Sequence, residues 1–385
     1  MSYKAFIAGS GGIGSAVAIL LRTVWEEHVD IWLGDISEDT LEKAQDFIKQ
    51  SEIYIDEDTE EEYDIEGSIE TVLMKEGWEQ TLPQMDILLD CLPGKFAPQM
   101  AQIAKDRGMH YVNLTEYVQE TKQIQDIAKD AQTGFALQCG LAPGFVNVVG
   151  MHLFHTFCQN YDVSSVKTIE MRVGALTRHA AAPHFYGFTW SPIGVATEYI
   201  KDSEVVQNGV LTVIPSLSDT KSKLVDGTLL EEDFTSGGVA DLPFALDGHV
   251  QNLNYKTFRY PGHYDWVRKQ LQDMPADCTS QDRIDRLESI MLDNIPSVED
   301  DTVVVYVAVE GLDANGVLRR IEESFWVEPI EIGSTTLRAI QATTAAGMAE
   351  AARMLLTSNH KGVLLQSQFD TEDYLSGPFV SLIYE

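Results

Sequence analysis

The chain has 385 residues, with 27 Lys and Arg against 60 Asp and Glu, so its formal net charge is −33. This length predicts two or three domains, and 44% hydrophobic with 23% charged residues is typical of a folded protein. The charge argues against a nucleic-acid-binding or anionic-membrane-binding surface, because phosphates are bound by clustered lysines and arginines. The excess acid is typical of a solvated surface, and an acidic pocket for a cationic substrate is the alternative interpretation.

The cysteines and the apolar runs indicate the compartment. None of the four cysteines belongs to a Cys-x-x-Cys pair or has metal-ligand spacing to a histidine, so we expect reduced thiols and no metal. The N-terminal apolar run is too short for a signal peptide, and no stretch approaches the roughly 18 apolar residues of a membrane span. We therefore expect a cytoplasmic protein without a membrane or nucleic-acid partner.

The first third of the chain alternates short apolar runs with helical patterns. The expected strands are 3–8, 29–34, 86–90, 110–114 and 135–139. Strands alternating with helices are typical of an α/β protein with a Rossmann-like, doubly wound parallel sheet. One helix should begin after Ser37, which is a favourable N-cap followed by two acids. The stretch Asp56–Glu66 holds eight acids, which we expect on a solvated surface.

Near residue 140 the pattern becomes rich in strands. The expected elements are a helix at about 146–159 and strands at 166–173, 210–214, 302–310 and 317–327. Asp313-Ala314-Asn315-Gly316 predicts a hairpin between the last two strands, because Asn-Gly accepts positive φ. We expect an inserted α+β domain with a mixed or antiparallel sheet, followed by a long helix at about 335–356. The predicted boundaries are 1–140 for the Rossmann domain, 141–334 for the substrate or dimerisation domain and 335–385 for a C-terminal segment.

A glycine motif, Gly9-x-Gly11-x-x-Gly14, follows the first expected strand and opens the first helix, as in dinucleotide-binding turns. Gly9 allows the tight turn, Gly11 lets a pyrophosphate approach the backbone, and Gly14 lets helix and strand pack. The N–H groups at the helix start would bind the phosphates. Asp35 ends the next strand about 20 residues later, where a carboxylate binds ribose hydroxyls and repels a 2′-phosphate. We therefore expect NAD, with NADP less favoured.

A second cofactor contact is expected at Cys91-Leu92-Pro93, because ligands bind beyond the carboxyl ends of such strands. Cys91 could pack as a buried thiol or have a chemical role, and the sequence leaves both open. Pro143, where the first domain gives way to the second, could line the nicotinamide pocket. The predicted cofactor-binding residues are Gly9, Ser10, Gly11, Gly12, Ile13, Gly14, Asp35, Ile36, Cys91, Leu92, Pro93 and Pro143.

Three motifs in the second part of the chain add to this signal. They are Gly140-Leu141-Ala142-Pro143-Gly144, Thr189-Trp190-Ser191-Pro192 with Glu198-Tyr199, and Lys256-Thr257-Phe258-Arg259-Tyr260-Pro261-Gly262-His263. Together with the glycine motif, Asp90-Cys91-Leu92-Pro93 and His110–Leu114, they make the chain resemble the saccharopine dehydrogenase-like superfamily over nearly its whole length. Within it, the chain is most similar to the branch of lysine 6-dehydrogenase and saccharopine reductase.

The resemblance implies a Rossmann domain that carries NAD(P) and an inserted domain whose sheet covers the substrate cleft and often makes the dimer contact. It also implies that the tail returns to the first domain. The implied chemistry is hydride transfer between nicotinamide and a carbon that bears an amine, with an imine that water hydrolyses, or the reverse. The chain departs from the family at Asn113, where an Asp is frequent, and at Leu364-Leu365-Gln366, where relatives of lysine dehydrogenase carry Pro-Glu.

An amino-acid substrate brings a carboxylate, whose natural partner is a bidentate arginine. Arg259 is the first candidate and Arg178 the second. The proton acceptor could be a histidine, which has a suitable pKa, a desolvated lysine or a tyrosine. The predicted catalytic residues are His263 and Lys256. The predicted substrate-binding residues are Arg259, Tyr186, Trp190, Ser191, Glu198 and Thr257, and Tyr199 is a further candidate contact for a substrate ammonium.

These observations favour an NAD(P)-dependent dehydrogenase acting on a C–N bond of an amino acid such as lysine or a saccharopine-like amine. One alternative is a carboxynorspermidine-type reductase that forms polyamines, for which a pocket with several acids and one arginine would be expected. The other is a dinucleotide-binding regulator without catalysis. The expected partners are a small amino-acid substrate and a second copy of the chain in a homodimer.

Overall fold

The computed structural model describes residues 2–52, 54–55, 62–63, 68–116, 118–275 and 277–384. The acidic stretch Asp56–Glu66 lies outside these residues, apart from positions 62 and 63. The chain divides into two units, the first built from residues 1–145, 329–337 and 341–385 and the second from residues 146–328 and 338–340. No helix in the described ranges has the length and apolar character needed to cross a bilayer.

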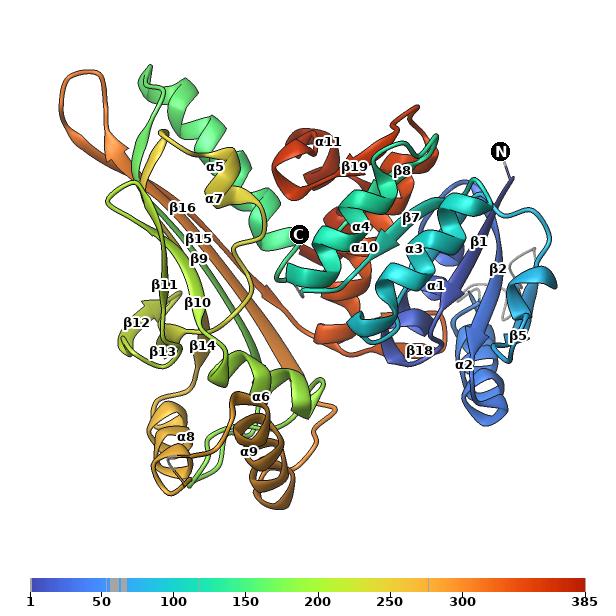
Figure 1. The fold of residues 1–385 in the computed structure, drawn as a ribbon, viewed down its shortest axis with the longest axis horizontal. Coiled ribbons are helices and arrows are strands. Elements are labelled where there is room, and N and C mark those ends of the chain that lie inside the picture. The colour runs from blue at the N-terminus through green and yellow to red at the C-terminus, as the bar shows by residue number, and fades with distance from the viewer. Residues whose placement is uncertain are drawn as a thin grey trace. The chain divides into compact units, whose positions relative to one another are not determined.

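The first unit contains a seven-stranded parallel sheet, which confirms the predicted Rossmann-like fold. Its strands, in spatial order, are β19 (Gly362–Leu364), β8 (Gly134–Ala136), β7 (His110–Asn113), β6 (Ile87–Asp90), β1 (Ser2–Ala8), β2 (His28–Asp35) and β5 (Ile69–Leu73). From β1 the chain builds outward through β2 to β5 (Figure 1), and it then returns to β6 on the other side of β1. The topological switch point therefore lies between β1 and β6, which is where ligands bind in doubly wound sheets.

The helices of this unit follow their apolar patterns. They are α1 (Gly12–Thr23), α2 (Glu38–Ser51), α3 (Ala97–Asp106), α4 (Val118–Ala128), α10 (Ala339–Leu356), α11 (Thr371–Leu375) and α12 (Pro378–Tyr384), and the first two residues of α10 belong to the second unit. Helix α1 is apolar on all sides and buried from Gly14 to Arg22, whereas α2 buries one stripe. The predicted cap is confirmed, since the Ser37 hydroxyl accepts the Thr40 N–H at 3.2 Å.

The predicted start of the C-terminal helix at about 335 is wrong. A short hairpin of β17 (Ile330–Ile332) and β18 (Thr335–Leu337) precedes α10, which begins at Ala339. Gly333 adopts a φ of +53° in the turn, and Thr335 and Thr336 are β-branched residues that favour a strand over a helix.

The second unit contains an eight-stranded sheet in which, among the residues that the structure describes, only β9 and β14 pair in parallel, which confirms the predicted mixed or antiparallel sheet. Its strands are β9 (Val166–Thr177), β10 (Ser203–Gln207), β11 (Val210–Ile214), β12 (Lys221–Val225), β13 (Thr228–Phe234), β14 (Val250–Arg259), β15 (Asp301–Leu312) and β16 (Leu318–Val327). The Asn-Gly hairpin between β15 and β16 forms as predicted. Strands β10, β12, β13 and β14 were not predicted from the sequence.

A hairpin and several helices pack against this sheet. On one face the β12–β13 hairpin crosses the long strands, because the Asp226 carboxylate at its tip accepts hydrogen bonds from Ser324 and Trp326 of β16 at 2.6 and 2.9 Å. Helices α6 (Pro192–Ile200), α8 (His263–Gln272) and α9 (Ser280–Asn294) share an apolar core at one end of the sheet (Figure 1). Helices α5 (Phe145–Tyr161) and α7 (Leu242–Ala245) complete the unit.

Candidate functional site

The glycine turn joins β1 to α1 at the switch point of the first unit. Gly9 has a φ of +95°, and a Cβ placed on Gly14 would lie 1.9 Å from the carbonyl oxygen of Gly9, so neither position has room for a side chain. A Cβ on Gly11 would meet no described atom within 4 Å. Gly11 is also the N-cap of α1, and no side chain of the described residues caps it. The three glycines therefore have the geometry of a phosphate-binding turn that is open at Gly11.

Asp35 lies at the end of β2 and is directed at this turn. Its carboxylate accepts the backbone N–H and the hydroxyl of Ser10, both at 3.2 Å, and the N–H of Ser37 at 3.1 Å. The side chain of the next residue, Ile36, is 81% exposed. A half-buried carboxylate beside an exposed apolar side chain fits the sugar and base end of a dinucleotide.

The Cys91–Pro93 turn, after β6, packs against the glycine turn. The Cys91 N–H donates to the Ala8 carbonyl at 2.8 Å, and a Cβ on Gly9 would lie 3.0 Å from the Cys91 carbonyl group. The Cys91 sulfur lies 3.6 Å from the sulfur of Met348, and burial raises the pKa of the thiol. These contacts favour the packing interpretation of Cys91 over a nucleophilic one.

Pro143 belongs to a tight turn that follows β8. The Gly140 N–H donates to the Pro143 carbonyl at 3.1 Å, and the Phe145 N–H donates to the Gly140 carbonyl at 2.9 Å. Gly144 has a φ of +139°, and a Cβ there would lie 2.0 Å from the Gly140 oxygen. Backbone contacts thus fix the turn that was predicted to line the nicotinamide pocket.

In the second unit, the end of β14 places Arg259 among aromatic side chains. The Arg259 cluster consists of Arg259, Tyr186, Glu198, Tyr199 and His263. The guanidinium is 1% exposed, lies 4.9 Å from the Tyr186 ring centroid, and donates from Nε to the Tyr199 hydroxyl at 2.7 Å. Its Nη2 lies 3.8 Å from Glu198 Oε2. The structure therefore brings four of the predicted site residues together around the first-choice arginine.

The hydrogen bonds of this cluster have one consistent direction. Because Arg259 donates to the Tyr199 oxygen, the Tyr199 proton points to Nε2 of His263, 2.9 Å away, and His263 donates from Nδ1 to the His184 carbonyl at 2.7 Å. Burial, and secondarily the positive charge of Arg259, lower the pKa of His263 to about 3, so the ring is neutral. Both ring nitrogens are thus engaged, which favours a positioning role, and the catalytic role stays a prediction.

The remaining substrate-binding candidates lie near this cluster or support it. The Ser191 hydroxyl caps α6 by accepting the Gly194 N–H at 3.3 Å. Trp190 packs against Gly194, where a Cβ would lie 2.4 Å from its ring. Thr257, buried on β14, shares a 2.6 Å hydrogen bond with the Thr235 hydroxyl. These contacts match the local roles of a cap and a packed wall, and substrate binding by the three residues stays a prediction.

Lys256 lies on the opposite face of the sheet from Arg259, because the two residues are three positions apart on one strand and side chains alternate. Its ammonium group contacts the Asp219 carbonyl at 2.8 Å, the Asp219 carboxylate at 2.9 Å and the Glu232 carboxylate at 3.4 Å. The structure therefore separates Lys256 from His263, the other predicted catalytic residue.

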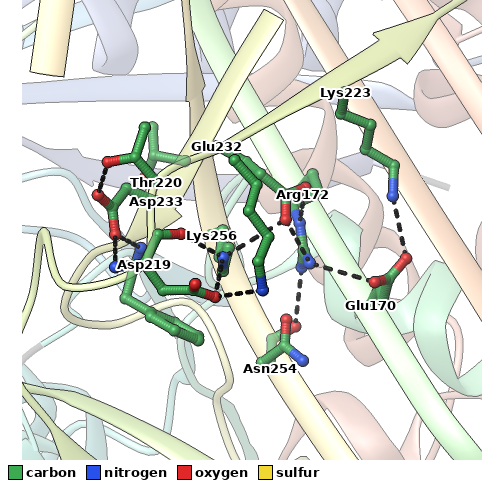
Figure 2. Close-up of polar contacts among 12 residues, drawn as sticks. Glu170, Arg172, Asp219, Thr220, Lys223, Glu232, Asp233, Asn254 and Lys256 are labelled. Carbon is green, nitrogen blue, oxygen red and sulfur yellow. Dashed lines mark hydrogen bonds and ion pairs between the residues drawn. The ribbon is translucent and has the colours of Figure 1, made fainter.

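Lys256 forms part of a charge ladder, shown in Figure 2, that consists of Asp219, Lys256, Glu232, Arg172, Glu170 and Lys223. Arg172 donates to Glu232 at 2.7 Å and lies 3.5 Å from Glu170, and Lys223 contacts Glu170 at 3.0 Å. Burial opposes ionisation of Glu170, but Arg172, a 2.7 Å hydrogen bond from Arg320 and Lys223 together lower its pKa to about 2. Alternating charges satisfy one another, so the ladder is a structural network.

Arg178, the second candidate for the substrate carboxylate, occupies a different environment. Its side chain is 47% exposed and forms ion pairs with Asp300, at 3.1 Å, and with Glu328. Two carboxylates already neutralise this guanidinium, so Arg259 stays the better candidate.

A parallel sheet with a glycine turn at its switch point, and an acid at the end of the next strand that contacts this turn, is typical of a dinucleotide-binding protein. Residues 5–136 match the model of the saccharopine dehydrogenase NADP binding domain, and residues 140–381 match that of the saccharopine dehydrogenase C-terminal domain. The chain therefore belongs to the saccharopine dehydrogenase family, whose members are oxidoreductases.

Two solved structures share the fold over most of their length. Saccharopine dehydrogenase (L-Glu forming) from Saccharomyces cerevisiae is 12% identical, with a TM-score of 0.72 over 99% of this chain and 98% of that one. Homospermidine synthase from Legionella pneumophila, in complex with NAD, is 12% identical, with a TM-score of 0.63 over 100% of this chain and 90% of that one. At this identity they show the fold alone, while the family match supports a dinucleotide cofactor.

Proposed function

We propose that this protein is an NAD-dependent dehydrogenase that acts on a C–N bond of an amino acid. The buried Arg259 guanidinium carries the substrate part of the proposal. It is held rigidly by Tyr199 and the Phe258 carbonyl, and its Nη2 is 3.8 Å from a carboxylate, beyond hydrogen-bond reach. A fixed planar cation of this kind suits the carboxylate of an amino acid.

The family chemistry assigns simple tasks to these residues. A nicotinamide dinucleotide held at the glycine turn and Asp35 would supply hydride transfer to or from the amine-bearing carbon, coupled to loss or gain of a proton at the nitrogen. In the oxidative direction, water then adds to the imine and the C–N bond breaks. Arg259 orients the substrate, and the Tyr199–His263–His184 hydrogen bonds keep the arginine from rotating.

Asp35 supports NAD over NADP. Its carboxylate already accepts hydrogen bonds at the glycine turn, so a 2′-phosphate there would meet negative charge. Asp35→Ala should raise the Kd for NAD roughly tenfold, because a hydrogen bond to a charged group is lost, and should leave the Kd for NADP the same or lower. Asp39→Ala, at the exposed start of α2, is the matched control.

The decisive assay follows the absorbance of NADH with lysine, ornithine, saccharopine and polyamine conjugates as substrates, in both reaction directions. Turnover with an amino acid supports the proposal. Turnover with polyamine substrates alone would instead establish the polyamine-forming reductase. Binding of NADH without turnover of any amine would establish the dinucleotide-binding regulator.

We also propose a homodimer. The terminal strand β11 has no charged residue and exposes Val210 and Val213 to 62% and 59%, which is unusual for an unprotected sheet edge. Pairing of two such edges would bring uncharged strands together, so no charged side chain of β11 would be placed at the contact. Sedimentation equilibrium of the full chain measures the assembly directly.

A further inference from the structure

The carboxyl end of β6 holds a buried acid that the glycine motif does not explain. Asp90 is 2% exposed and is the last residue of the strand. One of its carboxylate oxygens accepts the Leu92 N–H at 3.1 Å, and the other accepts the Tyr111 hydroxyl at 2.8 Å. Asp90 thus joins the Cys91–Pro93 turn to the neighbouring strand β7, which carries Tyr111.

This turn is in direct contact with the cofactor-binding backbone. The Cys91 carbonyl group lies so close to Gly9 that a Cβ there would approach it to 3.0 Å, and the Leu92 side chain would be 3.2 Å from the same Cβ. A displacement of Leu92 would therefore move atoms that border the glycine turn. The Asp90 carboxylate is the side chain that holds the Leu92 N–H in place.

The position of Tyr111 accommodates two protonation states of this acid. Its hydroxyl lies within hydrogen-bond distance of both Asp90, at 2.8 Å, and the Ala97 carbonyl, at 3.2 Å. When Asp90 is ionised, Tyr111 donates to it. When Asp90 is protonated, it donates to the Tyr111 oxygen, and the tyrosine proton turns to Ala97. Burial raises the pKa of Asp90 to about 7, and the titratable groups that face it are Tyr111 and the Cys91 thiol.

We propose that Asp90 and Tyr111 form a positioning pair that holds the Cys91–Pro93 turn against the glycine turn and thereby sets the affinity for the dinucleotide. The ionised carboxylate makes the stronger hydrogen bond to Leu92, so the turn is held most firmly when Asp90 is charged. This inference rests on the proposed function only in requiring that the protein bind a nicotinamide dinucleotide.

The test is a fluorescence titration of the full chain with NADH between about pH 6 and pH 8, which needs no substrate. Wild-type affinity should rise with pH. Asp90→Ala should raise the Kd about tenfold at the upper pH, because the acceptor for Leu92 is lost. Asp90→Asn keeps an acceptor and should bind NADH with little pH dependence. Tyr111→Phe should move the midpoint to higher pH, since the tyrosine hydrogen bond lowers the pKa of Asp90.

The matched control is Asp86→Asn, which makes the same change at an exposed acid just before β6, at its opposite end, and should bind NADH like the wild type. Two results would overturn the inference: unchanged affinity in a folded Asp90→Ala variant, or an unchanged pH profile in Asp90→Asn. A wild-type protein that binds neither NADH nor NADPH would instead overturn the proposed function itself. Thermal unfolding of each variant establishes that it is folded.

Discussion

The glycine turn of the first unit and the Arg259 cluster of the second both gather polar groups, but they do so by different means. The turn uses consecutive backbone from Gly9 to Gly14, with a single side chain from the next strand, Asp35. The cluster draws side chains from a loop, from α6, from β14 and from α8. A site made of backbone depends on the space available to it, whereas a site made of side chains depends on hydrogen bonds and charge.

The largest effect should come from filling the glycine turn. Gly14→Ala places a Cβ 1.9 Å from the Gly9 oxygen, so the turn must open, at a cost of about 3 kcal/mol in the free energy of unfolding, and dinucleotide binding should be lost. Gly11→Ala is the control, because its Cβ meets no described atom within 4 Å. Because Gly11 is the N-cap of α1 and Ala is a poorer cap, it should lower the Tm slightly, much less than Gly14→Ala, while it also weakens binding. Equal Tm values for both variants would contradict the steric account.

The second effect tests the charge ladder. Lys256→Met leaves the Asp219 and Glu232 carboxylates without their shared cation and should lower the free energy of unfolding by about 3 kcal/mol, with little change in KM. Lys221→Met is the control, since this exposed lysine contacts the same Asp219 at 2.7 Å and should cost less than about 0.5 kcal/mol. A Lys256→Met enzyme of normal stability that has lost its kcat would restore the catalytic role of this lysine.

The strand β14 shows where sequence reasoning succeeded and where it failed. The motif around Lys256 and Arg259 was found, but the segment was not recognised as a strand, so both side chains were assigned to one site. Recognition of β14 would have placed them on opposite faces by the two-residue alternation alone. In contrast, the glycine motif predicted its geometry well, because the contact that excludes a side chain at Gly14 is made with Gly9, five positions earlier in the same turn.

Other features of the candidate sites have no sequence signal of that kind. His184 enters the Arg259 cluster through its backbone carbonyl, and Tyr111 reaches Asp90 from a different strand. Both contacts depend on which elements the fold places side by side. The hairpin across the second sheet is a similar case, since Asp226 meets residues about 100 positions later in the chain.

The third effect tests the arginine assignment. Arg259→Lys keeps the charge but replaces the planar fork, which contacts the Tyr199 hydroxyl and the Phe258 carbonyl from two different nitrogens, with a single ammonium nitrogen that cannot also bind a carboxylate bidentately. We expect kcat/KM for the amino-acid substrate to fall about a hundredfold, with the Kd for NADH unchanged. Arg178→Lys, at the exposed second candidate, should change kcat/KM less than about twofold. The reverse ranking would transfer the carboxylate-binding role to Arg178.

The smallest effect is a pH dependence that arises in the Arg259 cluster. The pKa of His263 is about 3 in the folded protein and about 6.5 when unfolded, so the folded state excludes a proton that the unfolded chain takes up. The free energy of unfolding therefore has its full value above pH 6.5 and decreases as the pH falls. The decrease reaches about 2 kcal/mol at pH 5. His263→Gln removes this titrating group, so urea unfolding of the variant should show a smaller loss of unfolding free energy between these two pH values. The control is His249→Gln, at an exposed histidine whose ring contacts the Ser164 carbonyl. This variant should retain the wild-type dependence of unfolding free energy on pH. If His263→Gln also kept that dependence, the histidine would be charged in the folded state, and the one-directional hydrogen-bond chain from Arg259 would be wrong.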